Sequence, residues 1–135
     1  MDDKKKKILL VDDDEDFVMM NEAVLENLGY RVDSANSAKE GLEKVKSFQP
    51  DIIILDLMME HYDSGFTFSY QVKSNPETKH IPILMVTSVR RETNIPFDAS
   101  TNEEKEWIKV DEFMEKPISP EDIASKVEQL LAAAK

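Results

Sequence analysis

The chain has 135 residues, of which 41% are hydrophobic and 33% are charged, a composition typical of one globular domain. Its formal net charge of -11 disfavours nucleic acid and anionic membranes as partners, because an acidic surface repels their phosphates. The chain has no cysteine, no signal-peptide pattern and no apolar run near the ~18–20 residues of a membrane span, so disulfides are excluded and we expect a cytoplasmic location.

The first part of the chain predicts a strand, a helix and a second strand. Residues 7–11 form a short apolar run of the kind found in central parallel strands, and the run stops at three aspartates, 12–14. We expect Asp14 to cap a helix that ends at Gly29. The apolar side chains that recur at helical spacing there are Phe17, Met20, Val24 and Leu28. Residues 31–35 predict a second, weaker strand.

The middle of the chain repeats this alternation. Ser37 and Glu40 form a capping-box pattern that opens a second helix. Residues 51–55 predict the most apolar strand of the chain, and this strand stops at Asp56. A third helix is expected to begin at Gly65.

The last part of the chain is less regular. Residues 81–86 predict a fourth strand that stops at Thr87. The polar residues 90–106 show no clear pattern, so the region of a fourth helix is expected to be irregular. Residues 112–114 predict a short fifth strand, and Ser119 caps a final helix. The side chains of that helix expected to face inward are Ile123, Val127, Leu130 and Leu131.

Strands that alternate with helices predict an α/β fold with a parallel sheet. We expect a flavodoxin-like, doubly wound sheet of five strands in the order 2-1-3-4-5, with helices on both faces. Neither a linker nor an internal repeat is visible, so residues 1–135 are interpreted as a single domain with its core at about residues 6–131.

Polar residues follow several of these strands at the points where they end. Asp12 and Asp13 follow the first strand and Asp56 follows the third, while Thr87 and Lys116 follow the fourth and fifth. Ligands of open parallel sheets bind at these carboxyl ends, and neighbouring strands lie only about 4.8 Å apart. The acids should therefore meet, and Mg²⁺ would relieve their repulsion, since it favours carboxylates together with phosphate oxygens.

Phosphoryl transfer gives each of these residues a role. Asp56 is the expected nucleophile, which would form an acyl phosphate. Asp13 would bind Mg²⁺ directly, Asp12 directly or through water, and the backbone carbonyl of Met58 would supply a further ligand. Two residues would contact the phosphoryl oxygens, Lys116 by its charge and Thr87 by its hydroxyl.

The chain resembles the two-component response-regulator receiver family over about residues 6–131. The segments that carry the resemblance are ILLVDDDED at 8–16, DIIILDLMM at 51–59, IPILMVTS at 81–88 and EKP at 115–117. The resemblance implies a domain that a partner histidine kinase or phosphotransfer protein phosphorylates, and that then switches its binding to a downstream protein. It also implies a switch pair, Thr87 and Phe113, although Phe113 fits a plain core residue equally well. The chain ends where the receiver ends, which is similar to the stand-alone chemotaxis type without an output domain.

Two segments depart from the family pattern. The loop after Asp56 lacks the usual Pro-Gly and is one residue longer, which affects the metal side of the site. The segment between Thr87 and Lys116 is several residues longer than usual, which affects the signalling face.

Two other functions stay open from the sequence. One is an interaction module of the same fold that does not use phosphorylation. The other is a phosphatase of the haloacid dehalogenase type, but such enzymes need a second aspartate two residues after the nucleophile, and residue 58 is Met. We therefore expect no enzyme. The sequence does not decide the oligomeric state, the kinase or the downstream partner.

Overall fold

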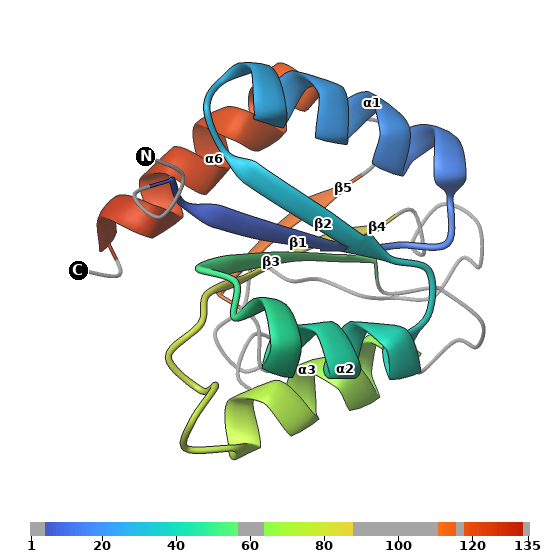
Figure 1. The fold of residues 1–135 in the computed structure, drawn as a ribbon, viewed down its shortest axis with the longest axis vertical. Helices are drawn as coiled ribbons and strands as arrows, with labels where there is room; N and C mark the ends of the chain where they lie inside the picture. Colours follow the sequence, from blue (N-terminus) through green and yellow to red (C-terminus); the bar gives the residue numbers. More distant parts are fainter. Residues whose placement is uncertain (1–4, 57–63, 88–110, 116–117, 134–135) are drawn as a thin grey trace.

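The computed structural model describes residues 5–56, 64–87, 111–115 and 118–133 (Figure 1). The elements, in chain order, are β1 (Lys7–Val11), α1 (Glu15–Asn27), β2 (Arg31–Ala35), α2 (Ala38–Phe48), β3 (Ile52–Asp56), α3 (Ser64–Ser74), β4 (Ile83–Thr87), β5 (Glu112–Glu115) and α6 (Pro120–Ala133). The five strands pair in parallel in the order β2-β1-β3-β4-β5. The predicted flavodoxin-like α/β fold is therefore confirmed.

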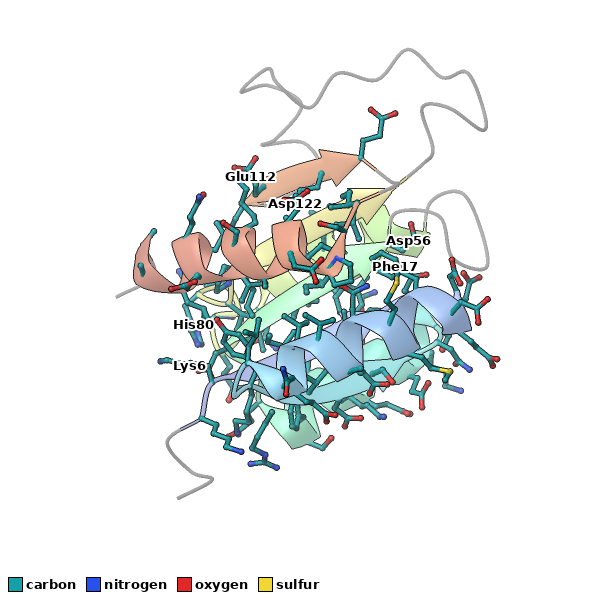
Figure 2. All side chains as sticks on the ribbon, turned by 90° about the horizontal axis from the view of Figure 1, so that it is seen from above. Lys6, Phe17, Asp56, His80, Glu112 and Asp122 are labelled. Atoms are coloured by element: carbon teal, nitrogen blue, oxygen red, sulfur yellow. The ribbon has the colours of Figure 1, made fainter. Side chains whose placement is uncertain are left out.

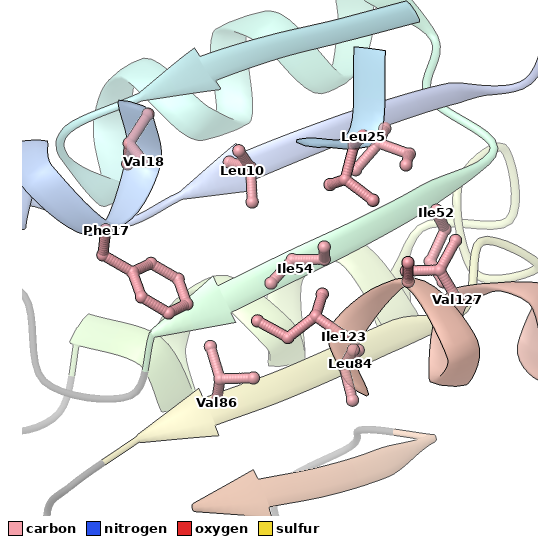
Figure 3. Close-up of a cluster of buried hydrophobic side chains, with 12 residues drawn as sticks. Leu10, Phe17, Val18, Leu25, Ile52, Ile54, Leu84, Val86, Ile123 and Val127 are labelled. Carbon is pink, nitrogen blue, oxygen red and sulfur yellow. The ribbon is translucent and has the colours of Figure 1, made fainter. Parts of the chain in front are cut away.

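Helices cover both faces of the sheet, α1 and α6 on one face and α2 and α3 on the other (Figure 1). Because successive side chains of a strand point to opposite faces, each central strand supplies both cores. Ile54 faces the α1 and α6 side, where it packs with Phe17 and Ile123 (Figure 3). Leu55 faces the other side, in the cluster that contains Phe68. This double burial explains why the central strands read as continuous apolar runs.

The buried face of α1 differs from the predicted stripe. Phe17 is buried, but Met20 and Leu28 are 48% and 58% exposed. The residues of α1 that are buried are Phe17, Val18, Asn21 and Leu25. The prediction was wrong for Met20 and Leu28. The buried face of α1 contains a polar residue, Asn21, so the spacing of apolar residues alone does not identify that face.

The predicted helix caps are present. The Asp14 carboxylate accepts a hydrogen bond from the amide of Phe17, and Gly29 after α1 has a φ of 104°. Ser37 Oγ accepts from the amide of Glu40 at 3.1 Å. The Glu40 side chain accepts from the amide of Asn36 at 2.9 Å, one residue before the position that a capping box uses. These caps fix where α1 and α2 begin beside the ends of the strands.

Gly41 allows α2 to lie close to the sheet. A Cβ atom on Gly41 would lie 2.8 Å from Cε2 of Phe68 and 3.0 Å from Cγ1 of Val11. Both neighbours are buried, so a larger residue would push α2 away from β1 and α3. Of the helices that the structure describes, none is long and apolar enough to cross a membrane.

Candidate functional site

Three carboxylates meet at the carboxyl end of the central strands. One oxygen atom from each of Asp12, Asp13 and Asp56 lies within 4.8 Å of the other two. The register of the sheet explains this, because Val11 of β1 pairs with Leu55 of β3, and the next residue of each chain segment is an aspartate. Figure 2 shows Asp56 at this end of the sheet, beside the start of α1. The structure thus brings together the three acids that the sequence singles out.

The three acids differ in their exposure to solvent. Asp12 is 2% exposed and Asp56 is 6% exposed, whereas Asp13 is exposed. The backbone holds Asp12 in place: its amide donates to the carbonyl of Ala35 at 3.0 Å, and its Oδ1 accepts from the amide of Asp14 at 2.9 Å. Asp12 and Asp56 are therefore buried at the end of the sheet. Asp13 is exposed to the solvent, from which an ion or ligand would enter.

The arrangement concentrates negative charge. Two unit charges about 4 Å apart repel each other by about 4 kcal/mol at an effective dielectric constant of about 20. A divalent cation would replace this repulsion with attraction, and carboxylate oxygens are the ligands that hard cations prefer. Octahedral Mg²⁺ with bonds of about 2.1 Å holds its oxygen ligands roughly 3 to 4.2 Å apart. The observed separations, within 4.8 Å, are close enough for small side-chain rotations to reach that geometry.

A hollow of about 360 Å³ opens beside Asp12. Its lining includes four charged side chains from α1 and α2: Glu15, Glu22, Glu40 and Lys44. The pKa of Glu22 is raised above its usual value, first by burial and then by the charges of Glu26 and Asp33, while Lys44 opposes the rise. No sequence pattern indicates this acidic lining. The only role expected for Glu40 was that of a cap, and no pattern distinguishes Glu22 from other helix acids.

The backbone of β4 and β5 reaches the same end of the sheet. Val86 of β4 pairs with Asp56, and the following residue, Thr87, pairs with Glu115 of β5. Thr87 therefore lies one residue beyond the level of Asp56 on the neighbouring strand. The fourth strand was predicted at residues 81–86 with Thr87 after it, whereas β4 runs from Ile83 to Thr87 and includes Thr87 as its last residue.

Other predicted site residues stay predictions. The side chains of Thr87 and Phe113 are not among those that the structure describes, although their backbones belong to β4 and β5. Met58, Lys116 and residues 88–110, which include the expected irregular region, lie outside the described residues.

The comparison with known proteins identifies the family. Residues 8–128 match the response regulator receiver domain. The chain belongs to the response-regulator receiver family. It is thus a receiver domain of two-component signalling, a class of protein in which the receiver itself acts as a signalling module rather than as a metabolic enzyme.

Relatives of this receiver domain occur in longer and in similarly short proteins. It is 35% identical over 107 residues to the alkaline phosphatase synthesis transcriptional regulatory protein PhoP of Bacillus subtilis. The aligned region covers 79% of this chain and 40% of PhoP. It is 27% identical over 113 residues to the protein PilH of Pseudomonas aeruginosa, covering 82% of this chain and 84% of PilH. The receiver thus spans less than half the length of PhoP.

Solved structures of the family have the same fold. The chemotaxis response regulator CheY4 of Vibrio cholerae superimposes with a TM-score of 0.80 at 27% identity, covering 94% of this chain and 99% of CheY4. A two-component response regulator from Clostridium difficile gives a TM-score of 0.78 at 25% identity, covering 95% of this chain and 97% of that protein. The likeness extends over nearly the whole receiver.

Proposed function

We propose that this receiver accepts a phosphoryl group on Asp56 in a reaction that depends on Mg²⁺. The observation that carries the proposal is the convergence of Asp12, Asp13 and Asp56, with one oxygen of each within 4.8 Å of the others. The phosphodonor would be a histidine kinase or a phosphotransfer protein, and a downstream protein would read the change. The proposal includes a cytoplasmic location and a receiver unit of about residues 6–131.

The burial of Asp56 supports its proposed role as the nucleophile. Its carboxylate is at the end of β3 and only 6% exposed, so few water molecules compete for the incoming phosphorus. A carboxylate oxygen of Asp56 would attack the phosphorus atom of a phosphohistidine. The new O–P bond forms as the P–N bond breaks, and the imidazole leaves with the electron pair and takes up a proton. The product would be an aspartyl phosphate, with no change in the number of phosphoryl groups.

Asp12 and Asp13 would hold the metal ion together with Asp56. When bound, Mg²⁺ would neutralise charge on the phosphoryl oxygens, which is the main demand of phosphoryl transfer. The hydrogen bond from the amide of Asp14 keeps one Asp12 oxygen turned toward the start of α1. The backbone carbonyl of Met58, the ammonium of Lys116 and the hydroxyl of Thr87 complete the proposed site. Thr87 and Phe113 are the proposed switch residues.

The test is the mass of the protein after incubation with acetyl phosphate and Mg²⁺. We expect the mass to increase by one phosphoryl group, and peptide mapping to place the group on Asp56. Asp56→Asn should gain none. Asp16→Asn, which removes an exposed acid from the first turn of α1, is the matched control and should be phosphorylated like the parent protein.

Equal phosphorylation of Asp56→Asn and the parent protein would refute the assignment of the nucleophile. A protein that binds Mg²⁺ but is neither phosphorylated nor altered by beryllofluoride would instead be the interaction module without phosphorylation.

A further inference from the structure

The buried side chains behind the three carboxylates belong to one hydrophobic cluster. Val11 of β1 and Leu55 of β3 pair in the sheet, and each directly precedes an aspartate of the site. Both belong to the cluster that contains Phe68 of α3, and all three side chains are 0% exposed. The two strand ends that carry the acids therefore pack against the same group of side chains.

Gly41 of α2 makes room for Phe68 in this cluster. A Cβ atom at position 41 would lie 2.8 Å from Cε2 of Phe68, and 3.0 and 3.2 Å from the two methyl carbons of Val11. Nonbonded carbon atoms favour separations of about 3.5–4.0 Å, so these contacts would be repulsive. Helices α2 and α3 lie on the same face of the sheet (Figure 1), and there the small Gly41 and the large Phe68 fill one space together.

A methyl group at position 41 would disturb Asp12 by either of two routes. If Val11 moves, the chain carries the movement into Asp12, which is the next residue. If α2 moves instead, it pulls on Ala35, because only residues 36 and 37 join β2 to α2. The carbonyl of Ala35 accepts a hydrogen bond from the amide of Asp12 at 3.0 Å. Phe68 has little freedom to move away, because it is fully buried in a close-packed cluster.

A displaced carboxylate affects Mg²⁺ more than Ca²⁺. Mg²⁺ demands near-ideal octahedral geometry at about 2.0–2.1 Å, whereas Ca²⁺ accepts oxygen ligands at about 2.3–2.6 Å in flexible arrangements. The three carboxylates lie close together, with one oxygen of each within 4.8 Å of the other two. Close packing that holds these positions therefore favours the ion with the stricter geometry.

We propose that Gly41 and Phe68 are positioning residues that make the proposed metal site favour Mg²⁺ over Ca²⁺. They act through the neighbours of Asp12, namely Val11 in the chain and Ala35 in the sheet. The inference rests on the proposed function, because it takes the three carboxylates as the ligands of the ion.

The test is a titration of the ¹⁵N-labelled full chain with MgCl₂ or CaCl₂, followed by NMR. The amide of Asp14 donates to Asp12 Oδ1 at 2.9 Å, so its chemical shift reports on that carboxylate. In Gly41→Ala the Kd for Mg²⁺ should rise about tenfold, as is typical when the support of a metal ligand is lost, and the Kd for Ca²⁺ should stay within about threefold. Alanine favours helices more than glycine does, so a weaker α2 would not explain the loss.

A compensating substitution should reverse the effect. Phe68→Leu alone leaves a void behind Val11 and Leu55, and should also lower the ratio of Mg²⁺ affinity to Ca²⁺ affinity. Gly41→Ala/Phe68→Leu keeps the total volume closer to that of the parent, so its ratio should return to within about threefold of the parent's. If Gly41→Ala does not fold, Phe68→Leu and the double variant still decide the question.

Val45→Ala is the matched control. Val45 is a buried residue of α2 in the same cluster, but it lies beside Pro50 and Asp51, at the other end of the sheet from the acids. The substitution should lower stability and leave the ratio of the two affinities unchanged.

Three outcomes would overturn the proposal. They are a parent-like ratio in both single variants, an equal change of the ratio in Val45→Ala, and a double variant with a lower ratio than either single variant. A parent protein that binds neither ion would contradict both this inference and the proposed function. Mg²⁺ binding by a parent protein that acetyl phosphate does not phosphorylate would contradict the proposed function alone.

Discussion

Lys73, in the last turn of α3, and Asp111, directly before β5, form an ion pair with 2.8 Å between Nζ and Oδ2. The same carboxylate oxygen accepts a hydrogen bond from the amide of Ile83 at 2.8 Å, and Lys73 Nζ also donates to the carbonyl of Ile81 at 2.6 Å. One aspartate thus joins the last turn of α3, the start of β4 and the entry to β5. Since β5 lies next to β4 at the edge of the sheet, this pair helps to hold β5 in place.

Asp111→Ala should lower the free energy of unfolding by about 1–3 kcal/mol. The substitution leaves the Ile83 amide without this acceptor, and it leaves the Lys73 ammonium, whose side chain is 17% exposed, without its carboxylate. Urea denaturation followed by circular dichroism measures the change. Glu43→Ala, at an exposed position of α2, should change stability by no more than about 0.5 kcal/mol. Equal stability of the two variants would show that the ion pair contributes nothing.

Asn21→Leu should stabilise the protein by about 1 kcal/mol. Asn21 is fully buried, and among the described residues its Oδ1 has no hydrogen-bond partner, a state that costs about 1–3 kcal/mol. Its Nδ2 donates to the carbonyl of Phe17 at 2.8 Å, and losing that bond offsets part of the gain. Thermal unfolding measures the difference, with the exposed Asn27→Leu as control. A fall in stability would mean that the buried carbonyl has a partner, such as an internal water.

Mg²⁺ should stabilise the folded receiver, and Asp13→Asn should remove most of that effect. A ligand at about 100 times its Kd stabilises the folded state by about 2.7 kcal/mol. Without Mg²⁺, Asp13→Asn should be slightly more stable than the parent, because one of the crowded charges near Asp12 and Asp56 is gone. Thermal unfolding with and without Mg²⁺ tests both expected changes in stability, the one caused by the ion and the one caused by the substitution. Asp16→Asn should keep the full Mg²⁺ effect, and an unchanged effect in Asp13→Asn would exclude Asp13 as a ligand.

Glu22→Gln should stabilise the protein near neutral pH and lose that advantage in acid. The pKa of Glu22 in the folded protein is raised above 4.5, first by burial and then by Glu26 and Asp33, so ionisation costs more in the folded than in the unfolded state. Protonated Glu22 therefore favours folding below its unfolded pKa, and this contribution is lost as pH rises through the raised pKa.

The unfolding midpoints of Glu22→Gln and the parent should differ near pH 7 and converge at about pH 4. Glu43→Gln removes the same charge from the exposed face of α2 and controls for the lower net charge. A constant difference between Glu22→Gln and the parent across this range would contradict the prediction.

Sequence patterns were sufficient to predict those strands, helices and caps that depend on interactions between residues near one another in the chain. The strand at residues 7–11, the caps at Asp14 and Ser37, and the final helix from Ser119 all follow from neighbouring residues, and the structure has them. The third strand was predicted one residue early, since β3 includes Asp56. This difference of one residue does not change the location of the site, because the register still places Asp56 beside the acids that follow β1.

Contacts between distant segments could not be predicted in the same way. The apolar spacing of α1 pointed to Met20 and Leu28, but packing against the sheet and α6 buries Asn21 instead. Nothing around Lys73 indicates Asp111, and nothing around Gly41 indicates Phe68. Such pairs depend on the angle and distance at which helices lie on the sheet, and side-chain packing sets both.

The amino-acid sequence by itself determined the alternation of strands and helices, and with it the sheet order and the end of the sheet where the acids gather. It did so because burial on both faces demands continuous apolar strands, and because polar residues are tolerated only where those strands end. The tertiary structure alone decided how near the three carboxylates lie, which helix face is buried and how closely α2 approaches β1. Those properties arise from charges and surfaces that come together only when the helices pack on the sheet.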